Sequence, residues 1–320
     1  MKKTSLIALL ALLAACGSKG GSDDDKPSGG LPDIGGLPSV AESDVVAFSA
    51  TNLWEAADIS DDASWVSVDG DSLVYSFEGE DDETAFKLDS FKKDSSKGYY
   101  ISEKSRDDEI WYAKIENGKV TEDSDTPLDG YVKITDKVKE ALVLGGKANG
   151  FAYVDFGYWA EGYHSTGTGL DVSVAGYESF AGGLSSKLAT EPATGTFKGK
   201  ALGGVNIDSQ TIADVASKEL IGTVEFTLTG GTLAGQVVFP DMYTLNLNND
   251  GTVGLATGNT SNSKFNIDGW TKLSGDYSLA FFGPSADNAT EATGDFGYRA
   301  KSSDDTKIAT IVGAFGAKKQ

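Results

Sequence analysis

The sequence predicts an all-β protein that ends in an up-and-down antiparallel β-barrel of roughly eight to ten short strands. Three observations support this fold class. Segments in which apolar and polar residues alternate recur along the chain, which is typical of strands with one buried face. Glycine supplies 40 of the 320 residues and gathers in the turns between these segments, and no long helical pattern interrupts them. Hydrophobic residues make up 39%, enough for a core, so disorder of the whole chain is excluded.

The clearest strands lie in the second half of the chain. Residues 223–229 alternate, with Val224, Phe226 and Leu228 on one face. Two glycines separate them from residues 232–239, which predicts a hairpin. Further strands are predicted at residues 243–247, 277–282, 294–300 and 307–315.

The first half of the chain shows a weaker pattern. Residues 72–77 and 109–115 alternate, and residues 131–134 are a further candidate strand. Residues 133–144 predict a short helix. We therefore expect a β-rich domain here with one helical segment.

The first sixteen residues predict a bacterial lipoprotein signal. Two lysines precede the apolar run 6–13, which is too short to cross a bilayer and reads as a signal peptide over residues 1–15. The tetrapeptide 13–16, Leu-Ala-Ala-Cys, resembles the lipobox, in which Cys16 becomes lipidated. Each buried CH₂ contributes about 0.8 kcal/mol to membrane binding, so two or more acyl chains hold a protein stably. Gly17 in place of aspartate indicates delivery to the outer membrane by resemblance to the sorting rule of such lipoproteins.

Charge and glycine content divide the rest of the chain. Residues 16–40 are rich in glycine, serine and aspartate and form a flexible tether. Residues 41–145 carry 26 acidic and 11 basic residues, a net charge of −15, whereas residues 146–320 carry 18 and 12, a net charge of −6. This asymmetry and the glycines near residue 146 predict an acidic β-rich domain, 41–145, followed by the barrel domain, 146–320.

Composition excludes several function classes. The net charge of −21 argues against nucleic acid as a partner, since an anionic protein releases no counterions from it. A single cysteine and a single histidine exclude a disulfide scaffold and a multi-histidine metal centre. The chain has no G-x-S-x-G elbow, and its one thiol is expected to carry lipid. We expect a binding protein rather than an enzyme, with no catalytic residue, metal site or resident cofactor.

The C-terminal residues carry the most specific motif. Residues 279–286 read LAFFGPSA, residues 292–296 read ATGDF, and the chain closes with VGAFGAKK at 312–319. This pattern resembles the closing signature of the transferrin-binding protein B type of barrel. Looser matches lie at residues 195–199 and 232–235, and residues 156–160 resemble the opening strand of that barrel. The resemblance covers residues 146–320.

The resemblance implies a single lobe, in which an eight-stranded barrel stands beside a β-rich handle domain. It also implies a surface-exposed outer-membrane lipoprotein that captures a host iron or haem carrier, such as transferrin or haemoglobin. Such proteins work with an outer-membrane transporter and, in many cases, with a translocator that moves them to the surface. Two alternatives stay open: a host-factor recruiter or adhesin without a nutrient role, and a carrier of a small ligand inside the barrel.

Two groups of residues are candidate sites. His164 lies in a glycine-rich stretch predicted to be a loop after the first barrel strand, and it could be an axial ligand of a bound haem with Tyr163 or Tyr158 beside it. Trp159 and its aromatic neighbours could anchor an interface, or they could be barrel core. The alternative for His164 is an exposed loop residue.

The second group is acidic and could dock a basic partner, or it could be a solvated loop. It consists of Glu78, Glu80, Asp81, Asp82 and Glu83. Residues 246–251 resemble the start of a calcium loop, but the twelfth position is Thr257 instead of a bidentate carboxylate, which favours a plain turn.

Overall fold

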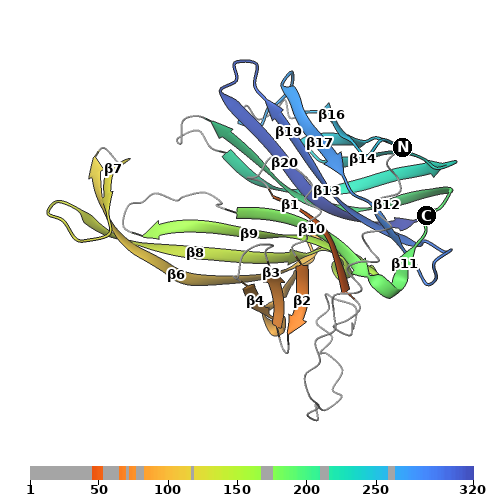
Figure 1. The fold of residues 1–320 in the computed structure, drawn as a ribbon, viewed down its shortest axis with the longest axis horizontal. Coiled ribbons are helices and arrows are strands. Elements are labelled where there is room, and N and C mark those ends of the chain that lie inside the picture. The colour runs from red at the N-terminus through yellow and green to blue at the C-terminus, as the bar shows by residue number, and fades with distance from the viewer. Residues whose placement is uncertain are drawn as a thin grey trace, which may run out of the picture. The chain divides into compact units, whose positions relative to one another are not determined.

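The computed structural model describes residues 45–52, 65–69, 72–76, 83–116, 119–166, 176–209, 216–258 and 264–320, all within one compact unit, residues 33–320 (Figure 1). These residues form antiparallel strands and three short 3₁₀ helices, so the predicted all-β class is confirmed. Within these ranges no helix has the length and apolarity that a bilayer crossing requires. Cys16, the signal peptide and the tether lie outside the described residues.

The second half of the chain forms a ten-stranded antiparallel sheet in the order β11-β18-β19-β20-β12-β13-β14-β15-β16, with β17 beside β19. Its strands are β11 (Leu188–Ala189), β12 (Thr194–Ser209), β13 (Ala216–Thr229), β14 (Thr232–Phe239), β15 (Tyr243–Leu247), β16 (Val253–Thr257), β17 (Thr271–Tyr277), β18 (Ala280–Phe282), β19 (Glu291–Lys301) and β20 (Lys307–Lys319). The hairpin predicted around Gly230 and Gly231 is confirmed as β13–β14. The strand predicted at residues 277–282 is divided between β17 and β18.

The last strand in this order, β16, lies against β17, which pairs with β19 near the other end of the sheet. Thr252, just before β16, forms a bridge with Asp276 of β17, and the Tyr277 N–H donates to the Gly251 carbonyl at 2.9 Å. The Lys272 ammonium also donates to the Val253 carbonyl at 2.6 Å. Because β17 pairs with β19, the strands β12 to β17, β19 and β20 follow one another in a ring. Among the described residues, this bridge and these two hydrogen bonds join the β16 segment to β17, in place of a paired ladder.

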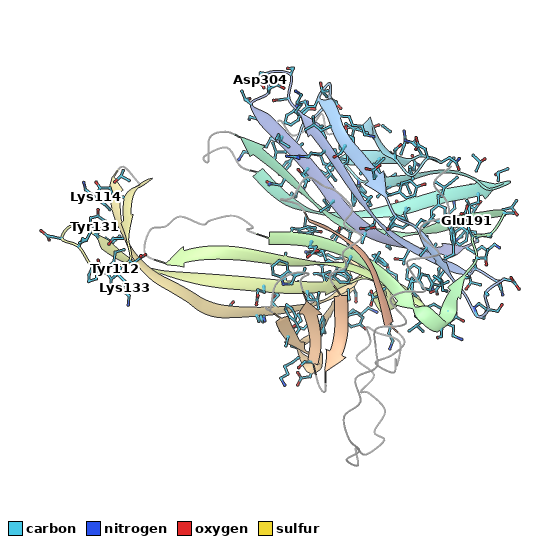
Figure 2. The ribbon with its side chains drawn as sticks, in the orientation of Figure 1. Tyr112, Lys114, Tyr131, Lys133, Glu191 and Asp304 are labelled. Atoms are coloured by element: carbon cyan, nitrogen blue, oxygen red, sulfur yellow. The ribbon has the colours of Figure 1, made fainter. Side chains whose placement is uncertain are left out.

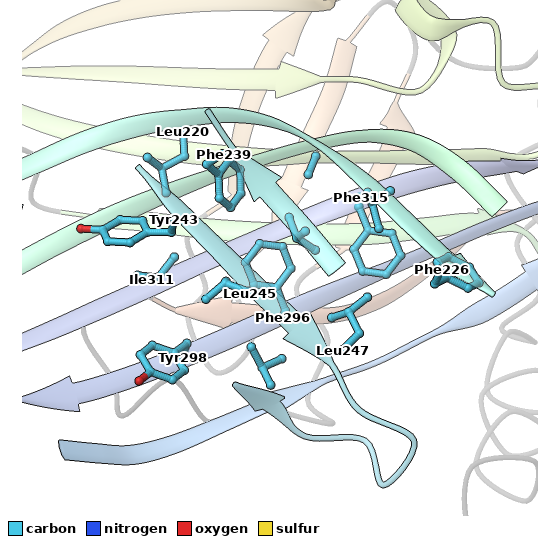
Figure 3. Close-up of a cluster of buried hydrophobic side chains, with 14 of the residues drawn as sticks. Leu220, Phe226, Phe239, Tyr243, Leu245, Leu247, Phe296, Tyr298, Ile311 and Phe315 are labelled. Carbon is cyan, nitrogen blue, oxygen red and sulfur yellow. The ribbon is translucent and has the colours of Figure 1, made fainter. Parts of the chain in front are cut away.

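Apolar side chains fill the interior of this ring (Figure 3). Val224, Phe226 and Leu228 are each 1% exposed, as the alternation predicts. The Phe226 ring stacks on Phe197 with centroids 5.1 Å apart, and it meets the Phe315 ring edge-on. An eight-stranded barrel has interior room for its own side chains or for one small ligand. Here buried apolar side chains lie in that interior.

The first half of the chain, with two later strands, forms a seven-stranded sheet in the order β1-β10-β9-β8-β6-β5, with β7 beside β6. Its strands are β1 (Val45–Asn52), β5 (Lys92–Asp94), β6 (Tyr99–Glu116), β7 (Lys119–Ser124), β8 (Val132–Leu144), β9 (Val154–Thr166) and β10 (Gly176–Leu184). A smaller sheet contains β2 (Trp65–Asp69), β3 (Ser72–Ser76) and β4 (Glu83–Lys87).

The helix predicted at residues 133–144 is wrong, since these residues form β8. The strand pairs with β6 along one edge and with β9 along the other. Both neighbours supply backbone hydrogen bonds, and this tertiary pairing overrides a weak local helix preference.

Along the chain, the strands change from the seven-stranded to the ten-stranded sheet after residue 184, later than residue 146. Strands β9 and β10, at residues 154–184, pair within the seven-stranded sheet, and β12 begins the ring at Thr194. Residues 156–160, expected to open the barrel, therefore lie in the other sheet, because β9 is held by β8 and β10. The domain boundary at residue 146 stays a prediction.

A second apolar cluster joins the two sheets where β9 and β10 pack against β12, β19 and β20; we call this contact the junction. Glycines let aromatic rings approach the facing backbone closely. A Cβ atom on Gly316 of β20 would lie 2.6 Å from the Phe156 ring, and one on Gly204 of β12 would lie 3.0 Å from the Tyr177 ring. The glycine content of the chain thus serves sheet packing as well as turns.

Candidate functional site

The seven-stranded sheet extends far beyond the junction. β6 has 18 residues, so it is about 60 Å long at roughly 3.3 Å per residue. β7 pairs only with the last part of β6, at the end furthest from the ring (Figure 1). We call residues 105–138, which contain the far parts of β6 and β8 together with β7, the arm.

The end of the arm presents aromatic and charged side chains, namely Tyr112, Lys114, Tyr131 and Lys133 (Figure 2). Leu128 is 49% exposed and Val132 is 43% exposed; Leu273 of β17 is the other large hydrophobic residue exposed to this degree in the described part of the chain. Half-buried tyrosines and charged groups accompany them. We call this set, which occupies both faces of the strand pair, the tip surface: Tyr112, Lys114, Glu122, Leu128, Tyr131, Val132 and Lys133. Tyr112 and Lys133 are paired and share one face, and Val132 lies on the other.

Hydrogen bonds hold the tip surface in place. The Tyr131 hydroxyl donates to Glu122 Oε2 at 2.6 Å, and the Lys114 ammonium lies 3.4 Å from Glu122 Oε1. These two groups lower the pKa of the Glu122 carboxyl, the tyrosine hydrogen bond first. The Tyr131 N–H closes a turn on the Leu128 carbonyl at 3.1 Å. These contacts hold the Tyr131 and Lys114 side chains against Glu122. Side chains that are already held lose less conformational entropy on binding.

The chemistry of the tip surface suits contact with a protein. Exposed aliphatic side chains beside tyrosines lose water on contact and gain packing, and surrounding charges give specificity and steer the approach. An extended strand pair that carries such residues far from the core lets them reach into a partner's surface.

The structure places two predicted ligand residues inside the protein. Tyr158 is 6% exposed and Trp159 is 5% exposed. The Tyr158 hydroxyl donates to Glu219 Oε1, and its ring stacks on Tyr177 with centroids 4.7 Å apart. The expectation that they border an open ligand site is corrected, because both belong to the packed faces of β9.

The prediction that His164 lies in a loop is wrong. His164 and Tyr163 belong to β9, where they pair with Lys137 and Val138 of β8. The ladder continues through the glycine-rich stretch to Thr166 because β8 supplies partners along its whole length. A haem-ligand role for His164 and Tyr163 stays a prediction.

The acidic docking cluster falls mostly outside the described residues. Glu78, Glu80, Asp81 and Asp82 lie there, and Glu83 is the first residue of β4. Its role in docking stays a prediction. Asn246 and Leu247 end β15, and residues 248–252 form the turn to β16, as expected, with the Thr252 N–H and hydroxyl donating to Asp250 Oδ1.

Sequence reasoning missed a polar cluster at the junction. Glu219 of β13 accepts hydrogen bonds from the hydroxyls of Tyr158 and Tyr99, the latter at 3.1 Å, and its other oxygen lies 3.0 Å from the Lys97 ammonium. Burial, together with the nearby Tyr177 and Glu219, raises the pKa of Tyr158 far above its usual value, so the phenol stays protonated and donates. The residues come from β6, β9 and β13 and from the loop before β6, and no sequence spacing connects them.

The described ranges hold no group of three or more histidine, cysteine, aspartate or glutamate side chains that could bind a metal ion. The oxygen atoms that do converge, around Glu219, are engaged with hydroxyl and ammonium donors. The arrangement supports hydrogen bonding between sheets.

No protein-family model and no curated protein matches this chain. Solved structures do. The intact N and C lobes of Ap-TbpB align over 87% of this chain and 46% of that one, with 15% identity and a TM-score of 0.43. A double mutant of transferrin-binding protein B from Haemophilus parasuis Hp5 aligns over 87% and 45%, with 17% identity and a TM-score of 0.41. A structure described as a surface lipoprotein aligns over 52% and 76%, with 16% identity and a TM-score of 0.32.

The chain spans less than half the length of the first two of these structures. Both are structures of transferrin-binding protein B, the family that the C-terminal motifs of this chain resemble.

Proposed function

We propose that this protein is a lipid-anchored outer-membrane surface protein that captures a host iron- or haem-carrying protein through the tip surface of its arm. The observation that carries the proposal is the exposure of Leu128 and Val132 at the end of a long strand pair, in the segment that also contains Tyr131. The lipobox at Cys16 supports the membrane anchor, and the C-terminal motif supports the class of partner. The same proposal includes binding without catalysis. It also includes delivery of the cargo to an outer-membrane transporter and display of the protein by a surface translocator.

Capture of a carrier protein is better supported than direct capture of haem. Tyr158 already donates its hydroxyl to Glu219, and Trp159 is buried, so neither presents a free ligand. Transport of a small ligand within the ring is also less well supported, because the rings of Phe226, Phe296 and Phe315 fill that space. The acidic charge of residues 41–145 would favour a basic surface on the partner.

The test measures binding of purified iron-loaded transferrin, haemoglobin and a haem-loaded carrier to the immobilised chain from residue 17 onward. We expect one carrier to bind, and the double variant Leu128→Asp/Val132→Asp to weaken it at least tenfold. Leu273→Asp is the matched control, since Leu273 is 46% exposed but lies on β17 of the ring.

Binding that the tip variant leaves intact would exclude the tip surface as the contact. Retention of a complement regulator or a matrix protein from serum, with no carrier bound, would overturn the nutrient role and favour the host-factor recruiter. An unchanged result with Leu273→Asp is required, because it shows that a new surface aspartate alone does not abolish binding.

A further inference from the structure

Asp155 holds the turn that enters the junction. It is the second residue of β9, and its Oδ1 accepts the Gly146 N–H at 2.6 Å and the Phe156 N–H at 2.8 Å. Gly146 begins the turn between β8 and β9, which contains the 3₁₀ helix η2 (Lys147–Asn149). One carboxyl oxygen therefore ties both ends of this turn together.

The other carboxyl oxygen is buried away from solvent. Asp155 Oδ2 is buried and has no hydrogen-bond partner among the described residues. Burial raises the pKa of this carboxyl to about 7, and the N–H groups of Gly146 and Phe156 offset only part of that rise. A carboxylate at this position is charged, desolvated and half-satisfied, which is costly.

The charged groups on the surrounding elements are committed to other contacts. Glu291 of β19 accepts the N–H groups of Ala152 and Tyr153, both at 2.8 Å. The Lys318 ammonium of β20 donates to the Gly150 carbonyl and lies 5.0 Å from the Phe151 ring centroid. Lys147 on η2 is half-buried, and the neighbouring β10 presents glycine, Gly182, opposite Asp155. The turn is thus held on one side by Asp155 and on the other by the ring.

We propose that Asp155 makes the junction sensitive to protons: its neutral carboxyl lets the turn 145–151 stay closed against the ring, and its ionisation favours opening of the turn, which admits water to Oδ2. The inference concerns the anchorage of β8 and β9 and does not depend on the identity of any partner of the arm.

The direction of the effect follows from linkage. In the opened turn the carboxyl has the ordinary aspartate pKa of about 4, and in the closed turn its pKa is raised. The stabilisation of the closed turn is therefore fully present below about pH 4 and is lost as the pH rises through about 7. The opening constant should rise about tenfold per pH unit over this interval and level off above it.

Hydrogen exchange tests the proposal on the full chain. Amides in residues 145–156 are followed from pH 5 to pH 8, corrected for intrinsic exchange rates, in the wild type and in Asp155→Asn. The asparagine oxygen still accepts from both N–H groups but cannot ionise. We expect at least a tenfold rise in wild-type opening between pH 5 and pH 7 and no such rise in the variant. Asp129→Asn, in the exposed arm loop, should behave as the wild type.

Equal pH dependence in the wild type and in Asp155→Asn would overturn the proposal. A second measurement does not need the variant to fold. Infrared spectra of the wild type should show a protonated-carboxyl C=O band at pH 6 that titrates away near pH 7, since exposed carboxyls are already ionised there. Absence of such a band at pH 6 would also overturn the proposal.

Discussion

The ring and the arm are both antiparallel sheets, but they bury their residues in different ways. In the ring, β14 alternates between exposed and buried side chains along its length, and β20 is almost entirely buried. In β8, residues 142–144 at the junction are buried, whereas Val132 at the arm end is exposed. The ring therefore contains its own core, and the buried residues described in β8 lie at the junction.

This difference explains why the two regions can have separate tasks. Residues in the ring are fixed by packing, so most changes there cost stability. Leu128 and Val132 at the arm end are exposed, so changing them removes little packing and leaves them open to selection for binding. The junction joins the two sheets through hydrogen bonds of Glu291 and Glu219 and through the glycine–aromatic contacts.

The largest expected effect is in the ring core. Phe226→Ala removes a ring that is 1% exposed and that contacts Phe197, Phe281 and Phe315. We expect the free energy of unfolding to fall by about 3–5 kcal/mol, since the cavity adds to the lost burial. Urea unfolding followed by circular dichroism measures it. A loss as small as that of Leu128→Ala at the exposed arm end would contradict the difference between the regions.

A smaller effect is expected at the junction. The two Glu291 carboxylate oxygens accept the Ala152 and Tyr153 N–H groups. In Glu291→Gln an N–H₂ group replaces one of these oxygens, so one backbone N–H then faces another donor and loses its hydrogen bond. We expect a loss of about 1–3 kcal/mol, the cost of one unsatisfied buried group. Exchange at these two amides should quicken more than exchange within β14. Uniform acceleration across both sheets would show that the junction and the ring unfold as one unit.

Two tyrosine–glutamate hydrogen bonds form a matched pair. Tyr158→Phe removes the hydrogen bond that the buried Tyr158 hydroxyl donates to Glu219. Because Glu219 keeps its contacts with Tyr99 and Lys97, we expect the free energy of unfolding to fall by about 0.5–1.5 kcal/mol. Tyr131→Phe removes the equivalent bond to exposed Glu122 on the arm, where water replaces it, and should cost less. Urea unfolding of both variants gives the comparison. Equal losses would mean that burial at the junction adds nothing to this bond.

Sequence reasoning succeeded where local pattern and final packing agree. The alternation around Phe226 predicts both a strand and its inward face, and the two glycines after Thr229 predict the hairpin. It failed at residues 133–144, where pairing with β6 and β9 decides the structure, and at His164, where a glycine-rich stretch continues a strand.

The candidate site was harder to predict for a physical reason. Leu128 and Val132 are single apolar residues, and nothing in their neighbours shows that they are exposed until β6 and β8 are paired. Glu219 lies 61 residues from Tyr158, so only the contact between the sheets brings them together. Conversely, the aromatic residues around Trp159 predict a possible binding role, because the elements that bury β9 cannot be identified from the sequence of that one strand.

The smallest expected effect on stability is at the tip surface and separates folding from binding. Val132→Thr keeps the β-branched shape and replaces one methyl group with a hydroxyl that water can reach, because Val132 is 43% exposed. We expect the free energy of unfolding to change by less than about 0.5 kcal/mol. The same change at Val224, 1% exposed in the ring, buries the hydroxyl and should cost about 1–3 kcal/mol. Urea unfolding of both variants gives the comparison. If Val132→Thr destabilises the protein as much as Val224→Thr, then Val132 packs as core and cannot serve as a contact residue. If the loss is small, weaker carrier binding by tip variants reports loss of the contact and not loss of folding.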